Sequence, residues 1–530
     1  MRRSGACLGV FGVTLYCVVC GVLPAAMARA VEVDASVLEE LKHEIEELKR
    51  RDEQHRRRIE VLEQGVDSSQ GVESVPGAGP APLPGEPAPR PSSEEPESSG
   101  GVDAAESPQD PDRESRIRGD LYSRELGAAR LRLIDVSLDV IAAGGFSSVP
   151  NDTIEIIEYG EHDPKRRGFT LQQAELGIQG AIDPYLRGDA FLVYFLDANN
   201  ESRFELEEAF FTTMNLPFGL QDLGLQLQGG TYFTHFGRIN AQHPHFWRWQ
   251  DQPFVWSRIL GPDGLRGPGA NAAWLMPLPW FSELRLGMQN ANGETQVSFL
   301  SSDEVFDDTL ADFGVGGIGG RPIVYDEVHS LNDFTYLLRW TNGFDLSDTW
   351  STQLGLSAAL GPNGTGSDAR SYVYGTDFVF KWAPLETDRG WPFVELQGEL
   401  VRRVYEASAN PAMGLPEGTL YDWGLYAYGL WGFHRGWAAG LRYEYGSGSG
   451  DSYIDGAFVS HEQDPFRSTR HRVSPLLIFH PSEFARFRLQ YNFDHTPISL
   501  GAVGAGAPSN AHSVWLGVEF SLGAHAAHTY

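Results

Sequence analysis

The chain has 530 residues, a formal net charge of −30 at pH 7 and 12% aromatic residues. So acidic a chain does not suit the phosphates of nucleic acid, which we therefore exclude as a partner. The mean hydropathy is −0.28, and no long apolar run follows residue 30. This excludes a helical membrane protein but not a membrane barrel, whose strands alternate between apolar and polar residues.

Residues 1–30 have the features of a secretory signal peptide. Arg2 and Arg3 precede an apolar run over residues 8–23, and a small-residue cleavage site ends at Ala30. The run is shorter than the roughly 20 residues of a spanning helix, so we expect cleavage after Ala30. All three cysteines lie in this peptide. The mature chain would therefore lack disulfides, thiol catalysis and cysteine-ligated metal sites, as suits an oxidising compartment.

Residues 31–65 predict a helix that associates with other helices. Apolar residues recur at steps of three and four, a heptad pattern interrupted by Asp52 and His55. They are Leu38, Leu41, Ile45, Leu48, Ile59 and Leu62. We interpret the segment as a periplasmic coiled coil; a single solvated helix is the alternative.

Residues 66–117 predict a disordered linker. The stretch is rich in proline, glycine, serine and glutamate and has almost no large apolar residues. Such a composition cannot bury enough surface to fold. A coiled coil on this tether would also allow a structural role, in which the chain joins the outer membrane to the cell wall.

Residues 118–530 alternate between apolar and polar positions. In the run "RFRLQYNF", Arg486 and Arg488 share one face of a strand whose other face is apolar, and Arg442 has a similar place in an earlier run. A soluble sandwich also alternates, but the export signal and the thiol-free mature chain favour a membrane barrel. At roughly 25 residues per strand and connection, the region would form about 16 strands.

We therefore predict an all-β fold, an antiparallel transmembrane β-barrel of about 16 strands with an N-terminal α-helical coiled coil. The barrel would lie in the lipid bilayer of the outer membrane, with the N-terminal segment in the periplasm. The arginines Arg442, Arg486 and Arg488 are candidates for lumen-facing residues that set charge preference.

Three stretches, "FTLQQAELGIQGAIDPYLRGDAFL", "EEAFFTTMNLPFG" and "GGTYFTHFGRINAQHPHFWRWQDQPFV", together resemble the phosphate-selective porin O and P family. The resemblance is clearest over residues 165–300. The combination of "INAQHPH", "DQPFV", "GPDGLRGPGA" and "GMQNANGE" is similar to a subgroup labelled zinc-regulated outer-membrane receptors, as is the closing "SLGAHAAHTY". The family resemblance implies a homotrimeric porin of 16 strands with a loop folded into its lumen.

Two departures from the family limit what the resemblance implies. Phosphate selectivity in the family depends on arginine ladders and a lysine cluster, whereas this chain is acidic and its barrel region has few lysines. Phosphate specificity therefore does not carry over. A receptor of the TonB-dependent kind would need a globular plug before its barrel, and the predicted coiled coil and linker leave no room for one.

The stretch after "GGTYFTHFG" predicts a long connection over residues 238–269, because its four prolines are too many for a strand. Our interpretation is a constriction loop that packs aromatic residues against the wall and turns charged groups toward water. The alternative is an exterior or periplasmic loop with interfacial aromatics. The candidate pore residues are His243, His245, Arg248, Asp251, Arg258 and Arg266.

His243 and His245 are also the candidate metal ligands of the sequence. Two imidazoles can bind zinc, but a competent site has three or four ligands, and the others would have to come from elsewhere in the chain. We therefore expect polar loop histidines and no cofactor, with zinc binding as the alternative. That alternative corresponds to a zinc-regulated, metal-linked uptake barrel.

No catalytic motif is present in the sequence. The stretch "HEQDP" at residue 461 lacks the second histidine of a zinc protease. We therefore predict a non-enzymatic porin that allows passive diffusion of small hydrophilic solutes or ions through a loop-constricted pore.

Overall fold

The computed structural model describes residues 123–126, 129–132, 134–217, 220–302, 317–323, 327–501 and 506–523. The predicted signal peptide (1–30), coiled coil (31–65) and linker (66–117) lie outside these residues. Within the described ranges, no helix is long and apolar enough to cross a membrane. A short antiparallel hairpin of β1 (Ser123–Leu126) and β2 (Ala129–Arg132) precedes the main sheet.

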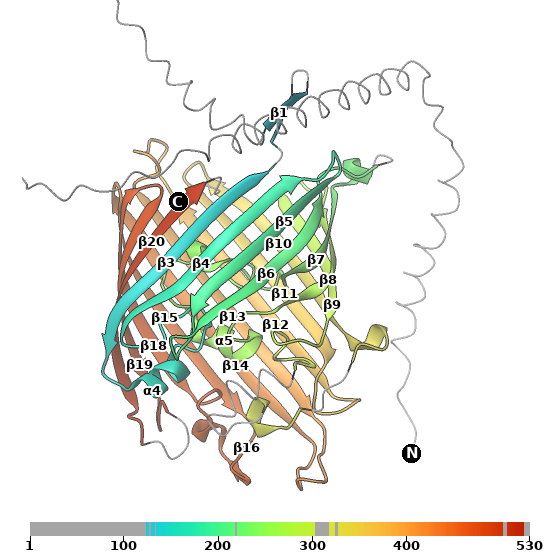
Figure 1. Ribbon diagram of the computed structural model, residues 1–530, viewed down its shortest axis with the longest axis vertical. Coiled ribbons are helices and arrows are strands. Elements are labelled where there is room, and N and C mark those ends of the chain that lie inside the picture. The colour runs from blue at the N-terminus through green and yellow to red at the C-terminus, as the bar shows by residue number, and fades with distance from the viewer. Residues whose placement is uncertain are drawn as a thin grey trace, which may run out of the picture. The chain divides into compact units, whose positions relative to one another are not determined.

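Sixteen of the described strands form one closed antiparallel barrel (Figure 1), so the predicted barrel and its strand number are confirmed. The first and last of them, β3 and β20, pair with each other and close the sheet. The strands are β3 (Asp135–Ser147), β4 (Gly168–Ala181), β5 (Leu186–Leu196), β6 (Ser202–Thr213), β7 (Leu225–Phe233), β8 (Arg266–Leu275), β9 (Phe281–Asn290), β10 (Phe334–Ser347), β11 (Trp350–Pro362), β12 (Arg370–Trp382), β13 (Phe393–Ala407), β14 (Gly418–His434), β15 (Trp437–Ser449), β18 (Arg470–Ser482), β19 (Ala485–His495) and β20 (Asn510–Gly523).

The barrel wall has its apolar side outward and its polar side inward. On β19, Phe487 and Leu489 are 39% and 48% exposed, whereas Arg486 and Arg488 are 2% and 1% exposed. This reverses the pattern of a soluble protein, in which arginine is almost never buried. An apolar outer face around a polar interior is the arrangement of a barrel that spans a lipid bilayer.

The two ends of the barrel differ in the length of their connections. At one end, two-residue turns join β14 to β15 and β18 to β19, and at the other end the connections include residues 234–265 and 291–333. We call these the short-turn end and the long-loop end. Membrane barrels place short turns in the periplasm and long loops outside. The start of β3 and the end of β20 both lie at the short-turn end (Figure 1).

The connections contain a few short elements. Two are helices of about two turns, α4 (Asn151–Ile157) and α5 (Phe254–Leu260), and α5 lies inside the barrel in Figure 1. The others are the hairpin β16 (Ser452–Ile454) and β17 (Ala457–Val459) and the 3₁₀ turns η1 (Leu220–Leu223), η2 (Pro244–Phe246), η5 (Ile318–Gly320), η6 (Leu331–Asp333) and η7 (His461–Gln463).

Two β-bulges change which side chains face inward. The register between β5 and β6 skips Glu207, and the register between β3 and β4 skips Gln172. A bulge places two consecutive residues opposite one, which breaks the alternation of faces. As a result Glu207 and Glu208 are both buried, as are Gln172 and Gln173.

Candidate functional site

The connection between β7 and β8, residues 234–265, folds into the barrel, and we call it the inner segment. A backbone without a sheet ladder must find other partners for its N–H groups. Strands on different parts of the wall provide them. The amide of Gly237 donates to Ser357 Oγ of β11 at 3.0 Å, and the amide of Gln250 donates to Gln490 Oε1 of β19 at 2.8 Å. The inner segment therefore crosses the interior.

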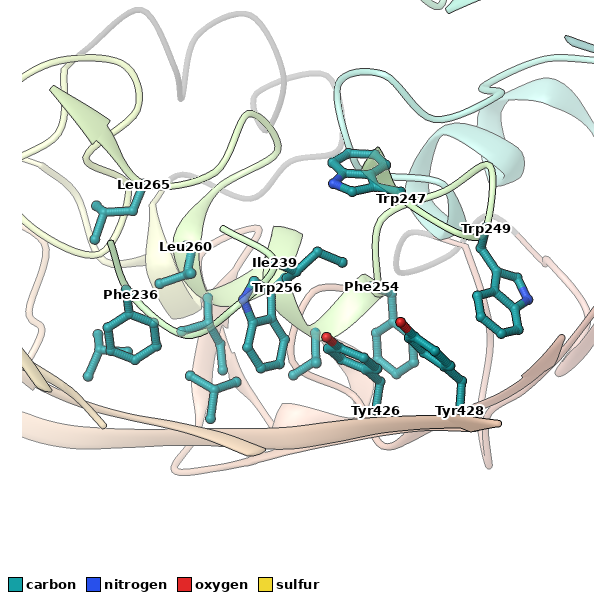
Figure 2. Close-up of a cluster of buried hydrophobic side chains, with 14 of the residues drawn as sticks. Phe236, Ile239, Trp247, Trp249, Phe254, Trp256, Leu260, Leu265, Tyr426 and Tyr428 are labelled. Atoms are coloured by element: carbon teal, nitrogen blue, oxygen red, sulfur yellow. The ribbon is translucent and has the colours of Figure 1, made fainter. Parts of the chain in front are cut away.

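Aromatic residues of the inner segment pack against the wall (Figure 2). The rings of Trp256 and Tyr426 meet edge to face with centroids 5.4 Å apart, and those of Trp249 and Tyr428 lie 4.8 Å apart. The side chains of Trp249, Phe254 and Trp256 are each at most 2% exposed. The cluster fixes the inner segment against β14 by burying apolar surface.

Inward-facing glycines allow the inner segment to lie so close to the wall. A Cβ atom at Gly424 would lie 2.3 Å from Val255 Cγ2, and one at Gly517 would lie 1.4 Å from Gln250 Nε2. At Gly424 the carbonyl oxygen of Tyr445 would also be only 2.4 Å away, so no side chain fits there without a backbone shift, whereas at Gly517 the end of the Gln250 side chain would have to move.

Asp251 is the most strongly bonded charged residue of the inner segment. It accepts hydrogen bonds from Arg442 Nη2 and Arg472 Nη1, each at 2.6 Å, and from Gln490 Nε2 at 2.6 Å. Asn492 Nδ2 donates to its second oxygen at 2.9 Å. Asp251 and Arg442, both candidates from the sequence, therefore form one ion-paired network with the wall. Asp251 is 0% exposed, so the prediction that it turns toward water was wrong.

Arg486 and Arg488 also hold the inner segment. Arg486 donates to the carbonyl oxygen of His245 at 2.8 Å, and Arg488 donates to those of Trp247 and Trp249 at 3.2 and 2.9 Å. Both guanidinium groups also pair with Glu519. Their charges are thus compensated by a carboxylate and by carbonyl oxygens.

The remaining arginine candidates lie at separate places. Arg248 pairs with Glu395 at 3.0 Å, and Arg258 donates to the carbonyl oxygen of Ser468 at 2.9 Å. Arg266 begins β8 and pairs with Asp263. The structure therefore distributes the six candidates around the interior.

His243 and His245, the candidate metal ligands from the sequence, each belong to a group of potential ligands that includes Glu175. His243 lies among three carboxylates. Its Nδ1 is 2.9 Å from Glu175 Oε2 and from Glu207 Oε2, and its Nε2 is 2.8 Å from Glu208 Oε2. Burial alone would lower the pKa of His243, but Glu175 and Glu207 outweigh it and raise that pKa well above its usual value. The ring of His245 stacks on that of His243, with centroids 5.6 Å apart.

A second group of titratable residues lies beside His243, and sequence reasoning missed it. Its four members, which we call the His162 cluster, have potential ligand atoms within 4.8 Å of one another; they are His162, Glu205, Glu207 and Asp263. His162 comes from the connection between β3 and β4, the two glutamates from β6, and Asp263 from the inner segment. The consecutive carboxylates of "FELEEAFF" were the only signal in the sequence.

Within this cluster, His162 faces two carboxylates. Its Nε2 lies 3.6 Å from Glu207 Oε1 and 3.9 Å from Asp263 Oδ1, and its Nδ1 lies 3.1 Å from the carbonyl oxygen of Gln172. His162 is 4% exposed and Glu207 is 0% exposed. Burial alone would lower the pKa of His162, but Glu207, Glu161 and Asp263 raise it to about 9.

Two cavities approach these clusters from opposite ends of the barrel. The long-loop cavity, about 430 Å³, has Glu161, Glu205 and Asp263 in its lining. The short-turn cavity, about 410 Å³, is lined by His243 and Glu208 among others. A continuous series of contacts, from His243 through Glu207 to His162, lies between the two cavities.

Glu158 follows α4 in the connection between β3 and β4. Its environment predicts that the stability of this loop, residues 148–167, depends on pH. Burial raises the pKa of Glu158 well above the usual value, Arg472 opposes this, and the charges of Asp251, Asp163 and Asp494 add to it. A carboxyl whose folded-state pKa is raised stabilises the docked loop below about pH 4.5, and this stabilisation is lost as pH rises through the raised pKa.

We therefore expect residues 148–167 to be cleaved faster by proteinase K at pH 9 than at pH 6. The rates should be normalised to the cleavage of an unfolded substrate such as casein at the same pH. The control Glu417→Gln removes an exposed carboxylate and should keep the pH dependence of the parent. In Glu158→Gln the pH dependence should become weaker, because the neutral amide cannot lose a proton, while His162 and Asp163 of the same loop still titrate. An unchanged pH dependence in Glu158→Gln would refute the assignment.

Comparisons with known proteins found similarity to an uncharacterized protein and to several outer-membrane proteins of known structure. No family model matches the sequence. An uncharacterized protein of Aquifex aeolicus (strain VF5) is 29% identical over 339 residues, which are 63% of this chain and 65%, less than two thirds, of that protein.

Solved structures with similar folds have low sequence identity. The outer membrane channel DcaP of Acinetobacter baumannii is 11% identical, with a TM-score of 0.44 over 73% of this chain and 96% of its own. The anion-selective porin from Comamonas acidovorans is 11% identical, with a TM-score of 0.41 over 74% and 98%. Salmonella typhi OmpF is 10% identical, with a TM-score of 0.39 over 73% and 97%. The relation to phosphate-selective porins stays a prediction from sequence motifs.

Proposed function

We propose that the protein is an outer-membrane porin for passive diffusion of small hydrophilic solutes or ions, constricted by the inner segment. The observation that carries this proposal is the closed barrel itself, apolar outside and polar inside, with a connection folded across its interior. The homotrimer implied by the family resemblance is part of the proposal.

The pore would run beside β4 to β8 rather than along β13 to β19. On the latter side, the inner segment buries the wall under aromatic side chains and ion pairs. On the former side lie the long-loop and short-turn cavities. The narrowest part of the path would be the His243–Glu207–His162 series between them.

The charges along this path favour cations. The long-loop cavity has six carboxylate residues in its lining and two cationic residues, Lys165 and Arg203; the carboxylates are Glu155, Glu161, Asp197, Glu205, Asp263 and Glu294. Acidic linings concentrate cations and repel anions. The candidate arginines Arg442, Arg486 and Arg488 are all compensated by carboxylates, so we assign them to positioning the inner segment.

Planar-bilayer recording tests the proposal directly. We expect stepwise conductance and, in a KCl gradient, a reversal potential of the sign for K⁺ over Cl⁻. Glu161→Gln/Glu294→Gln, which removes two charges from the long-loop cavity, should move that potential toward zero. The control Glu386→Gln/Glu417→Gln removes two exposed charges outside this cavity and should leave it unchanged. A silent barrel would refute the porin, and anion preference would refute the assigned selectivity.

A second candidate function is metal-linked uptake, the alternative that the sequence left open. One specific observation favours it, namely the buried histidine and carboxylates that join the two cavities. In this function, the wall and the inner segment keep the same roles, and the constriction would select its ion by coordination rather than by charge alone.

A further inference from the structure

The His162 cluster has an imidazole nitrogen whose surroundings suit a bound ion. His162 Nε2 is buried and makes no hydrogen bond within the described residues. Its nearest carboxylate oxygens, at 3.6 and 3.9 Å, lie beyond hydrogen-bond distance. Neither oxygen of Glu207 has a hydrogen bond of acceptable geometry among these residues, and the same holds for Glu205 Oε1. Buried polar atoms in this condition call for an explanation.

The distances match those between two ligands of one metal ion. Nitrogen and oxygen ligands lie about 2.0–2.2 Å from zinc, so at a tetrahedral angle their atoms are roughly 3.4 Å apart. The separation of His162 Nε2 from Glu207 Oε1, 3.6 Å, is close to this value. All four potential ligand atoms lie within 4.8 Å of one another, so one ion can contact each of them after small side-chain movements.

His162 and Glu207 each contact a second group of the kind that usually orients metal ligands. A metal-binding histidine usually donates its other ring N–H to a carbonyl or carboxylate oxygen. His162 Nδ1 has this partner in the carbonyl oxygen of Gln172 at 3.1 Å, where the β4 bulge places it. The far oxygen of Glu207 lies 2.9 Å from His243 Nδ1. The orientation of both His162 and Glu207 is therefore fixed by groups on the side away from the proposed ion.

The charges and the access path also suit a cation. Within the cluster, three carboxylates face one arginine, Arg266, which pairs with Asp263 and lies 3.5 Å from Glu205. Glu205 and Asp263 line the long-loop cavity, which gives an ion a route from the long-loop end. Glu161 adds negative charge to this route, and Lys165 and Arg203 are the cationic residues in the cavity lining.

We infer that His162, Glu205, Glu207 and Asp263 bind a divalent transition-metal ion such as Zn²⁺ at the inner end of the long-loop cavity. One imidazole and several carboxylates form a ligand set that zinc and its neighbours accept. His243, whose two ring nitrogens already contact carboxylates, acts behind Glu207 as a positioning residue. The site deepens the metal-linked candidate above, although binding itself does not require conduction.

Zinc titration of the full mature chain, folded in detergent and freed of metal with a chelator, tests this inference. All proteins carry His525→Ala/His528→Ala, so that the terminal histidines contribute no binding. Calorimetry should give one Zn²⁺ per chain. His162→Ala and the nearly isosteric Glu207→Gln should each weaken binding by at least about tenfold, which is the scale of losing even an outer-sphere partner. The control His434→Ala removes an exposed histidine at the short-turn end and should bind as the parent does.

Two further readings make the outcome decisive. Folding of each variant is checked by heat-modifiable gel mobility, and Co²⁺ substitution should give visible absorption bands that Glu207→Gln loses. Equal zinc affinity in the parent, His162→Ala and Glu207→Gln would overturn the site, as would a parent that binds no zinc. A chain that binds zinc but shows no conductance in bilayers would refute the porin and support the zinc site. A chain that conducts but binds no zinc would support the porin and refute the zinc site.

Discussion

Asp251→Asn should release the inner segment from the wall and raise the single-channel conductance. The substitution keeps the shape of the side chain but removes the charge that Arg442 and Arg472 share at 2.6 Å. Leaving one partner of a buried ion pair without its counter-charge costs about 3–5 kcal/mol. This is an upper limit here, because Arg442 keeps Glu444 and Arg472 keeps Glu158 and Asp494 as partners. We expect larger and noisier conductance steps, and faster trypsin cleavage at Arg248 and Arg258 of the folded barrel.

Asp388→Asn is the matched control, because its side chain is 67% exposed. The same change of charge and shape there should leave conductance and cleavage as in the parent. If Asp251→Asn behaved like this control, the ion-paired network would not be what holds the inner segment in place.

Trp249→Ala should have an effect of similar size by a different route. The indole is buried beside Tyr428, and its Nε1 donates to the carbonyl oxygen of Ser474 at 2.9 Å. Truncating a buried tryptophan to alanine costs about 3–5 kcal/mol. We expect a lower temperature for the heat-induced mobility shift and a wider pore, since the inner segment loses one of its aromatic contacts with β14 and keeps that of Trp256 with Tyr426.

Trp431→Ala, on the outward face of the same strand, is the control for this change. Its side chain is 57% exposed and contacts no part of the inner segment among the described ring contacts. Its conductance should equal that of the parent. A normal conductance in Trp249→Ala as well would mean that the aromatic cluster does not determine the width of the pore.

Much of the barrel was predictable from alternation alone. Because successive side chains of a strand point to opposite faces, the sequence around Arg486 and Arg488 already separates an arginine face from an apolar face. In a membrane barrel the apolar face contacts lipid and the other face lines the polar interior, so the orientation of the wall residues could be predicted as well. The aromatic packing of this connection was also predictable, because Pro244, Pro253 and Pro262 exclude a strand there and the tryptophans require burial. Its predicted end at residue 269 was wrong, since β8 begins at Arg266 and includes Pro268.

The His162 cluster was not predictable in the same way. Strict alternation would turn Glu207 and Glu208 to opposite faces, and only the bulge in β6 brings both inward. His162 and Asp263 are separated by about a hundred residues, and the fold of two connections brings them together. Neither the bulge nor the approach of two distant connections can be recognised from local sequence patterns. The sequence therefore indicated His243 and His245 and did not indicate His162.

The pairing of β3 with β20 has a consequence for how the molecule is made. Val140 of β3 lies opposite Phe520 of β20 in this pair. The first strand of the barrel in the chain can therefore pair fully only after the last strand is present. Until then, two sheet edges with unsatisfied backbone groups remain open to pairing with other chains. The sheet can therefore close only after β20 has been synthesised, and the edge of β3 stays without its partner for the whole of that time.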